Sequence, residues 1–366
     1  MRNNSLDLIR LVAVLLVLGR HADISVPKDE IFGTAFMHYW AQGGWIGVDI
    51  FFVLSGFLVS GLIFREWKTH HTIDLKRFII RRFLKIYPSF LILILSTMII
   101  SQKTVEPVPI KSVLVELFFL QNYFPGIWNH TWSLAVEVHF YLILILMCKL
   151  LIHLKDRGRN PFKYIPPIFL FIALLSLYFR GQAINIQPST FYQNFFPTHL
   201  RLDSLMFGVL LSWFWNFKDL SSYLQKRSIK LFLVILGITL MLPAFIFQLD
   251  VTPWISVYGV TLFYIGAGMI ILGSINSKTL SEGFFAKISK LGSYSYSIYI
   301  WHMIVRAYLL PQFYKLVSPF YSSTSWQTNV FLYITGSIFF GLVMAYLVEY
   351  PILIARDRYF SNKNFQ

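Results

Sequence analysis

Long apolar segments recur along the whole chain and constrain its fold more than any other feature. Ten of them approach the roughly 20 residues that a helix needs to cross the hydrocarbon core of a membrane. Only 13% of the 366 residues are charged, about half the share in a soluble domain. The sequence therefore predicts an all-α, polytopic membrane bundle of about ten transmembrane helices. They lie at residues 6–21, 45–64, 84–101, 132–151, 164–179, 201–215, 231–249, 255–274, 292–310 and 328–350.

The connecting segments leave little room for other structure. Residues 113–120 are apolar but too short to span, which indicates a re-entrant or interfacial piece. We expect one transmembrane domain over residues 1–366, without an appended soluble domain. The single cysteine, Cys148, excludes a disulfide framework and a cysteine-based metal site.

The distribution of Lys and Arg indicates the orientation. With a cytoplasmic N-terminus, 23 of them fall in segments on that side and five in outer loops. Cytoplasmic loops are enriched in these residues, so we expect both termini in the cytoplasm of a multi-pass protein in the cytoplasmic (inner) membrane. The net charge of +15 does not indicate a nucleic-acid partner, because the basic residues lie between apolar runs instead of on a solvated face. Membrane lipid is the expected surrounding partner.

Charged residues at membrane depth mark a functional site or a pairing that holds the bundle together. Arg10 and His21 are eleven residues apart in the first apolar segment. Eleven residues make about three helical turns, so both side chains project from one face, about 16 Å apart along the axis. Arg10 alone is explained by snorkelling and His21 alone by its place at a helix end, but the shared stripe favours a functional pair.

Further polar residues are predicted at the outer level, near His21. Asp49 lies near the start of the second span, within GGWIGVDIFFVLSGFL. Glu137 is the last residue of TWSLAVE and lies about one turn into the fourth span. Nearby glycines suit close helix packing but do not account for a carboxylate. Trp132 suits a membrane interface, and Ser133 suits a helix cap.

Three other polar residues allow a purely structural interpretation. Arg201 and Asp203 begin the sixth span, and we interpret them as a structural ion pair. His302 lies in the middle of the ninth span, and we interpret it as a core histidine with its hydrogen bonds satisfied.

A dense cationic face enters the third span at the inner side. It lies in LKRFIIRRFLKIYP and includes Arg81, Arg82 and Lys85. One interpretation is an anchor for anionic lipid headgroups. The other is a docking site for a polyanionic ligand, because guanidinium groups form forked contacts with phosphates. Glu349, at the inner end of the last span, is a candidate partner for this face.

Several of these motifs together resemble the membrane acyltransferase 3 family, which includes O-acetyltransferases of bacterial glycans such as O-antigen, peptidoglycan and Nod factors. The segment SLDLIRLVAVLLVLGRH is similar to the family's Arg-x10-His first helix, and GGWIGVDIFFVLSGFL to its second-helix signature. RRFLKIYP resembles its Arg-rich inner motif, and TWSLAVE its Trp-Ser-Leu-x-x-Glu element. Val138 stands where many members have a second carboxylate.

The resemblance implies an O-acyltransferase that moves an acetyl group from cytoplasmic acetyl-coenzyme A to a hydroxyl of a carbohydrate or lipid-linked cell-surface glycan. His21 is then the catalytic histidine, as general base or as the nucleophile that takes the acetyl group, and Asp49 or Glu137 orients it. No permanently bound cofactor and no metal are implied, and a homo-oligomer stays open. The implied donor-binding residues are Arg10, Arg81 and Arg82, and the implied substrate-binding residues are Trp132, Ser133, Arg201 and Asp203.

A second hypothesis is a transporter or flippase of a lipid-linked glycan that uses the same charges along a substrate path. Transporters of this size often have internal repeats with broken helices. The two halves of this chain lack matching Gly/Pro interruptions, which disfavours transport.

Overall fold

A computed structural model describes residues 3–22, 31–102, 107–154, 160–186, 190–249, 251–277, 280, 282–317 and 325–360, with only the backbone at 31–34. Throughout these ranges the regular structure is helical, as the apolar segments predict. The α-helices are α1 (Asn4–His21), α2 (Ile31–Gly43), α3 (Gly47–His70), α4 (Leu75–Ser101), α5 (Ile110–Leu117), α6 (Trp132–His153), α7 (Ile165–Ala183), α8 (Phe191–Asn194), α9 (Thr198–Phe217), α10 (Leu220–Tyr223), α11 (Arg227–Met241), α12 (Pro243–Ile246), α13 (Val260–Ser274), α15 (Gly283–Gly292), α16 (Ser295–Ile304), α17 (Leu310–Val317), α18 (Trp326–Met344) and α19 (Tyr350–Tyr359). Short 3₁₀ segments are η1 (Gly44–Ile46), η2 (Asn129–Thr131) and η3 (Pro161–Tyr164), and π-helical segments are η4 (Ile255–Gly259), η5 (Val305–Leu309) and η6 (Ala345–Glu349).

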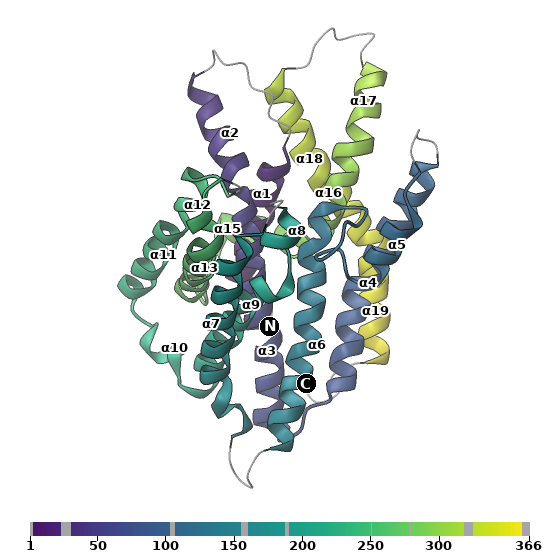
Figure 1. The fold of residues 1–366 in the computed structure, drawn as a ribbon. Coiled ribbons are helices and arrows are strands. Elements are labelled where there is room, and N and C mark those ends of the chain that lie inside the picture. Colours follow the sequence, from purple (N-terminus) through teal and green to yellow (C-terminus); the bar gives the residue numbers. More distant parts are fainter. Residues whose placement is uncertain are drawn as a thin grey trace.

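Seven helical segments in the described ranges are long and apolar enough to cross a membrane, which confirms a polytopic membrane bundle. The three remaining predicted spans also form helices, namely α1, α9 and the run from α16 to α17. Each of these three carries charged residues within it. Figure 1 shows the ends of α3 and α6 together at the lower end of the bundle, and the start of α2 and the end of α17 at the upper end.

The stretch before the second predicted span differs from the expectation. Residues 31–43 were expected in a loop but form α2, and one continuous helical segment runs from Ala35 to His70. The physical reason is packing on α1: the indole N–H of Trp40 donates to the Leu15 carbonyl at 3.2 Å. This apolar stretch buries surface against α1 and therefore has a partner that a loop prediction overlooks.

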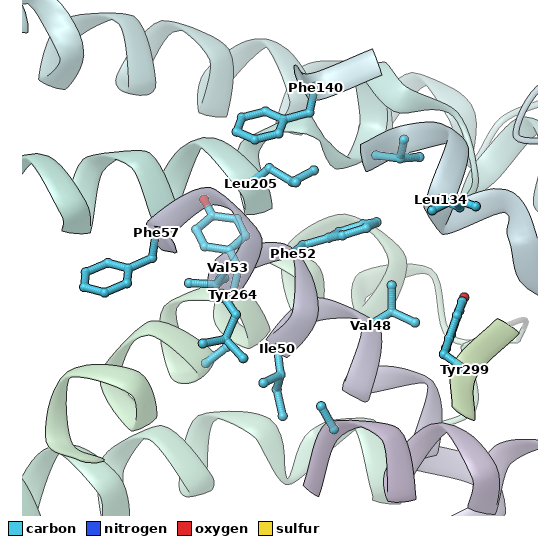
Figure 2. Close-up of a cluster of buried hydrophobic side chains, with 14 of the residues drawn as sticks. Val48, Ile50, Phe52, Val53, Phe57, Leu134, Phe140, Leu205, Tyr264 and Tyr299 are labelled. Atoms are coloured by element: carbon cyan, nitrogen blue, oxygen red, sulfur yellow. The ribbon is translucent and has the colours of Figure 1, made fainter. Parts of the chain in front are cut away.

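Helix α3 lies at the centre of the bundle and packs along α9, α1 and α13. A Cβ at Gly56 would lie 2.0 Å from the Leu205 carbonyl of α9, and one at Gly208 would lie 2.3 Å from the Val53 carbonyl of α3. The two backbones therefore touch where these glycines cross. Figure 2 shows the apolar side chains of this core, with Val48 and Tyr299 close together at one side of it.

The short apolar segment predicted at 113–120 overlaps the eight-residue helix α5 (Ile110–Leu117), which is too short to span. Its Glu116 is fully buried and accepts hydrogen bonds from the backbone N–H groups of Ile127 and Trp128, each at 3.0 Å. The Thr131 hydroxyl donates to the same carboxyl group at 3.0 Å. Glu116 thus ties α5 to the turn that leads into α6.

Candidate active site

A cavity of about 130 Å³ lies between α1, α3, α4, α6 and α16. Arg10, Arg82 and Lys85 bring three cationic side chains to its wall, and Glu137 brings the one carboxylate among its lining residues. Such an excess of positive charge suits an anionic ligand. The other polar lining residues are Ser55, Ser133, Tyr141, Ser295, Tyr296 and Tyr299.

Hydrogen bonds within the wall fix the position of Glu137. Its carboxylate accepts from the Ser55 and Tyr141 hydroxyls, which lie 2.8 Å from each other. Tyr141 follows Glu137 by four residues, so both lie on one face of α6. The Arg82 guanidinium lies 5.7 Å from the centre of the Tyr141 ring, within the range of a cation–π contact.

Arg81 and Arg82 have different surroundings although they are adjacent in sequence. Arg82 lines the cavity. Arg81 pairs with Asp357 of α19 at 2.9 Å and donates to the Phe360 carbonyl at 2.8 Å. Successive residues of a helix point about 100° apart, so α4 presents one arginine to the cavity and the other to the chain end. Arg10, in the cavity wall, pairs with Asp7 at 2.6 Å.

His21 ends α1 and is partly exposed. Its Nδ1 lies 3.0 Å from the Val17 carbonyl oxygen. A carbonyl only accepts, so Nδ1 carries the hydrogen and Nε2 carries a lone pair in the neutral ring. This is the tautomer that a base or a nucleophile needs.

Two further histidines lie beside His21 in the fold. The His302 ring centre is 5.0 Å from that of His21 and 4.8 Å from that of His130. The Tyr299 ring lies 5.7 Å from both His302 and His130. In the part of the chain that the structure describes, no three His, Cys, Asp or Glu residues are arranged to hold a metal ion.

Tyr299 also forms part of the cavity wall, so the same side chain borders the cavity and contacts the rings of His302 and His130. Its hydroxyl donates to the His130 carbonyl at 2.5 Å and lies 2.5 Å from the Ser133 hydroxyl. Tyr299, His130, Ser55 and Tyr141 were not singled out from the sequence. Only the i, i+4 spacing of Tyr141 from Glu137 offered a local signal.

The ion pairs of α9 differ from those expected. Arg201 pairs with Asp49 of α3 at 2.6 Å and Asp203 pairs with Arg180 of α7 at 2.8 Å, all four side chains being buried. The predicted Arg201–Asp203 pair is wrong because residues two apart on a helix point to nearly opposite sides.

The remaining predicted site residues are the two carboxylates expected to orient His21 and the residues expected to bind the substrate. Asp49 accepts hydrogen bonds from Arg201 and Ser204, and Glu137 accepts them from Ser55 and Tyr141. The expected contact of either carboxylate with His21 is therefore not formed in the described residues. Trp132 stacks on Phe196 at 4.7 Å between ring centres, and the Arg201 guanidinium lies 5.8 Å from the Trp132 ring. Ser133 lines the cavity, whereas Trp132, Asp49, Arg201 and Asp203 do not.

Glu349, the last residue of η6, lies near Lys85 and Arg356, which attract it electrostatically. Arg356 itself pairs with Asp357 at 2.8 Å. Glu349 thus faces cations, as the sequence indicated, but Lys85 and Arg356 lie near it instead of Arg81.

The fold and the cavity define a polytopic membrane protein with a cationic cavity beside buried histidines. The chain belongs to the acyltransferase 3 family, whose model, described as an acyltransferase domain, matches residues 3–350.

Curated relatives agree with this family. The chain is 31% identical to the peptidoglycan O-acetyltransferase OatA of Listeria monocytogenes, over 81% of this chain and 48% of the relative. It is 29% identical to a putative O-acetyltransferase of Staphylococcus aureus, over 83% of this chain and 50% of the relative. The O-acetyltransferase OatA of S. aureus is also 29% identical, over 72% and 46%. The chain thus spans about half the length of these relatives, and no solved structure matches it.

Proposed function

We propose that this protein is a membrane O-acetyltransferase that moves an acetyl group from cytoplasmic acetyl-coenzyme A to a hydroxyl of a carbohydrate or lipid-linked glycan. The observation that carries this proposal is a cationic cavity whose wall includes Tyr299, with the ring of Tyr299 beside His302 and the ring of His302 beside the tautomer-fixed His21. The relatives' names supply the acetyl group and, for one of them, peptidoglycan as the acceptor.

The cavity suits the phosphates of coenzyme A as donor. Arg10, Arg82 and Lys85 outnumber Glu137 in its wall, and guanidinium groups bind phosphate oxygens by paired, charge-assisted hydrogen bonds. Arg82 lies in the Lys- and Arg-rich segment of α4, on the side where we expect the donor to arrive from the cytoplasm. Arg81, held by Asp357, supports the chain end and is not proposed as a donor ligand.

His21 supplies the reactive nitrogen. In the direct route, an O–C bond forms between the acceptor hydroxyl and the acetyl carbon while the C–S bond breaks. The hydroxyl proton goes to His21 Nε2, and the C–S electron pair goes to the coenzyme A sulfur. In the alternative route, Nε2 bonds to the acetyl carbon while the C–S bond breaks and its electron pair goes to the coenzyme A sulfur. The acceptor oxygen then bonds to the acetyl carbon while the N–C bond breaks, and the hydroxyl proton goes to the freed Nε2. Both routes need the lone pair that the Val17 carbonyl fixes on Nε2.

Tyr299 and Ser133 form the part of the cavity wall that is connected to the histidines, because the Tyr299 ring lies beside His302 and His130. Both residues line the cavity and share a hydrogen bond, while His21 is absent from the lining residues. We propose that the acetyl end of the donor passes Tyr299, which lies beside His302, to reach Nε2. His21 is partly exposed at the end of α1, which suits an acceptor arriving from the outer side.

The test uses inverted membrane vesicles that contain native glycans and radiolabelled acetyl-coenzyme A. We expect label in the glycan with the wild type and none with His21→Ala, although the variant still inserts. His38→Ala is the matched control, because His38 is an exposed histidine of α2 outside the proposed site. Normal transfer by His21→Ala removes His21 from the mechanism. Glycan that crosses the membrane without acquiring label supports the transport hypothesis.

A further inference from the structure

His302 lies fully buried in α16 with one nitrogen that has no partner. Its Nδ1 lies 2.5 Å from the Tyr299 carbonyl oxygen and therefore donates its hydrogen there. Its Nε2 is then an acceptor, and among the described residues it has no hydrogen-bond partner. The sequence-based interpretation of His302 as a satisfied core histidine is thus wrong for one of its two nitrogens.

His130 lies beside His302 and also has one nitrogen near a carbonyl oxygen and one nitrogen without a partner among the described residues. Its Nε2 lies 3.3 Å from the Ile300 carbonyl oxygen, and its buried Nδ1 has no partner. Buried polar atoms are normally hydrogen-bonded, so an unpaired one requires an explanation. Two unpaired imidazole nitrogens lie in one row that His21 begins, in the order His21, His302, His130.

Among the described residues, the charged groups that act on His21 provide no anionic partner for its protonated form. Arg20 on the same helix and Arg306 on η5 are the charged groups that act on it in the described structure, and both repel a cation. His302 also faces His130 and Arg306, together with the ring of Tyr299. An imidazole lone pair is therefore the group placed to stabilise a proton on His21.

The ring geometry permits such a contact. The His21 and His302 centres are 5.0 Å apart with the rings tilted by 55°. An N–H···N bond of about 3 Å between two imidazoles needs about this separation, because each nitrogen lies roughly 1 Å from its ring centre. A rotation of one ring is sufficient to bring the two nitrogens together.

We propose that His302 is the positioning residue of His21, and that its unpaired Nε2 accepts a hydrogen bond from His21 once His21 holds the proton of the acceptor hydroxyl. This inference rests on the proposed role of His21 as the base. No bond to carbon changes in this step: the proton stays on His21 Nε2 and is shared with the lone pair of His302. His130 extends the row and acts only through His302.

The first experiment measures the pH profile of acetyl transfer for three proteins. A base works when it is deprotonated, so activity rises with pH through a midpoint. A hydrogen bond that favours the protonated form raises that midpoint. His302→Phe keeps a ring without a lone pair, so we expect its midpoint about one pH unit lower and its kcat at least about tenfold lower. His302→Gln places an amide oxygen near the position of Nε2, so we expect it to restore most of the wild-type midpoint. The KM for the donor should be unchanged in both.

The second experiment does not depend on transfer. Diethyl pyrocarbonate modifies deprotonated histidine, and mass spectrometry of the His21 peptide follows its modification against pH in purified protein without substrates. We expect His302→Phe to lower the midpoint for His21, with His130→Gln as the control that changes it less. If His302→Phe does not fold, His302→Asn replaces it, since its amide still donates to the Tyr299 carbonyl but does not reach His21.

The outcomes separate this inference from the proposed function. Equal midpoints for the wild type and His302→Phe, in protein that keeps its thermal stability, overturn the role of His302. A midpoint that shifts equally in His302→Phe and His302→Gln indicates a packing role and overturns it as well. Absent transfer by the wild type contradicts the proposed function, while the modification profile still decides whether His302 acts on His21.

Discussion

Neighbouring residues of one motif have different tasks in this protein. In the Arg-rich segment of α4, Arg82 reaches the cavity, whereas Arg81 pairs with Asp357. A sequence motif reports residue type and spacing, but the partner of each side chain depends on the direction in which the helix presents it.

Arg82→Ala should raise the KM for acetyl-coenzyme A by about tenfold or more, because a hydrogen bond to a charged group contributes about 1.5–3 kcal/mol. Arg81→Ala is the matched control and should change the donor KM far less. Initial rates over a range of donor concentrations measure both. Equal effects of the two substitutions would contradict the assignment of Arg82 to the donor cavity.

Glu116 gives a prediction for pH and stability. Burial raises the pKa of its carboxyl from 4.5 to about 7, against the opposing effect of its hydrogen bonds with Trp128, Thr131 and Ile127. The folded protein therefore binds a proton more tightly than the unfolded chain, and this contribution is lost as pH rises through about 7. Relative to Glu116→Gln, which does not titrate, the wild type should lose at most about 3 kcal/mol between pH 5 and pH 8.

Thermal unfolding of the two proteins in detergent, followed at several pH values, measures this difference. A constant difference across the range would show that Glu116 keeps the same protonation state in the folded and unfolded chain. Glu116→Ala is the companion variant. It leaves the N–H groups of Ile127 and Trp128 without their acceptor, at a cost of about 1–3 kcal/mol for each.

At the scale of helices, glycine positions decide how closely the central elements approach. Gly56 of α3 and Gly208 of α9 lie where the two backbones touch. The cavity wall on α3 includes Val48 and Ser55, so a displacement of α3 also moves part of the site.

Gly56→Ala should destabilise the bundle by about 1–3 kcal/mol or more, because its Cβ would meet the Leu205 carbonyl and α3 and α9 must separate. Gly181→Ala is the matched control, since a Cβ there meets nothing within 4 Å. Fluorescence-detected size-exclusion chromatography after heating compares the two variants. A Gly56→Ala protein as stable as Gly181→Ala would show that the crossing of α3 and α9 tolerates a wider separation.

The residue patterns predicted the helices more completely than their contacts. The segments around 84–101, 132–151 and 255–274 became α4, α6 and the run from η4 to α13, because a membrane requires long apolar helices with internally paired backbones. Helix α2 was overlooked, since its stability depends on α1 through contacts such as the Trp40–Leu15 hydrogen bond.

At the scale of the whole molecule, the distribution of Lys and Arg predicts the orientation in the membrane. Thr69, at the end of α3, and Gln327, at the start of α18, are both exposed. Cys148 is buried, so we expect a thiol reagent to label only an introduced cysteine. A membrane-impermeant maleimide should label Thr69→Cys only in inverted vesicles and Gln327→Cys only in right-side-out vesicles. The opposite pattern would reverse the orientation of the bundle.

The sequence by itself determined the membrane class, the main helices and the family. It also selected Arg10, Arg82, Glu137 and Ser133, four residues that line one cavity. Those conclusions follow from local properties: apolar length, helical period and motif spacing each depend on residues close together in the chain.

Only the tertiary structure decided which polar groups meet. It paired Arg201 with Asp49 instead of Asp203, and it placed His130 and His302, 172 positions apart in the chain, in contact beside His21. Such contacts depend on how each helix is rotated and on which neighbour it packs against. The free energy that sets these rotations comes from the packing of the whole bundle, so no single segment of sequence contains it.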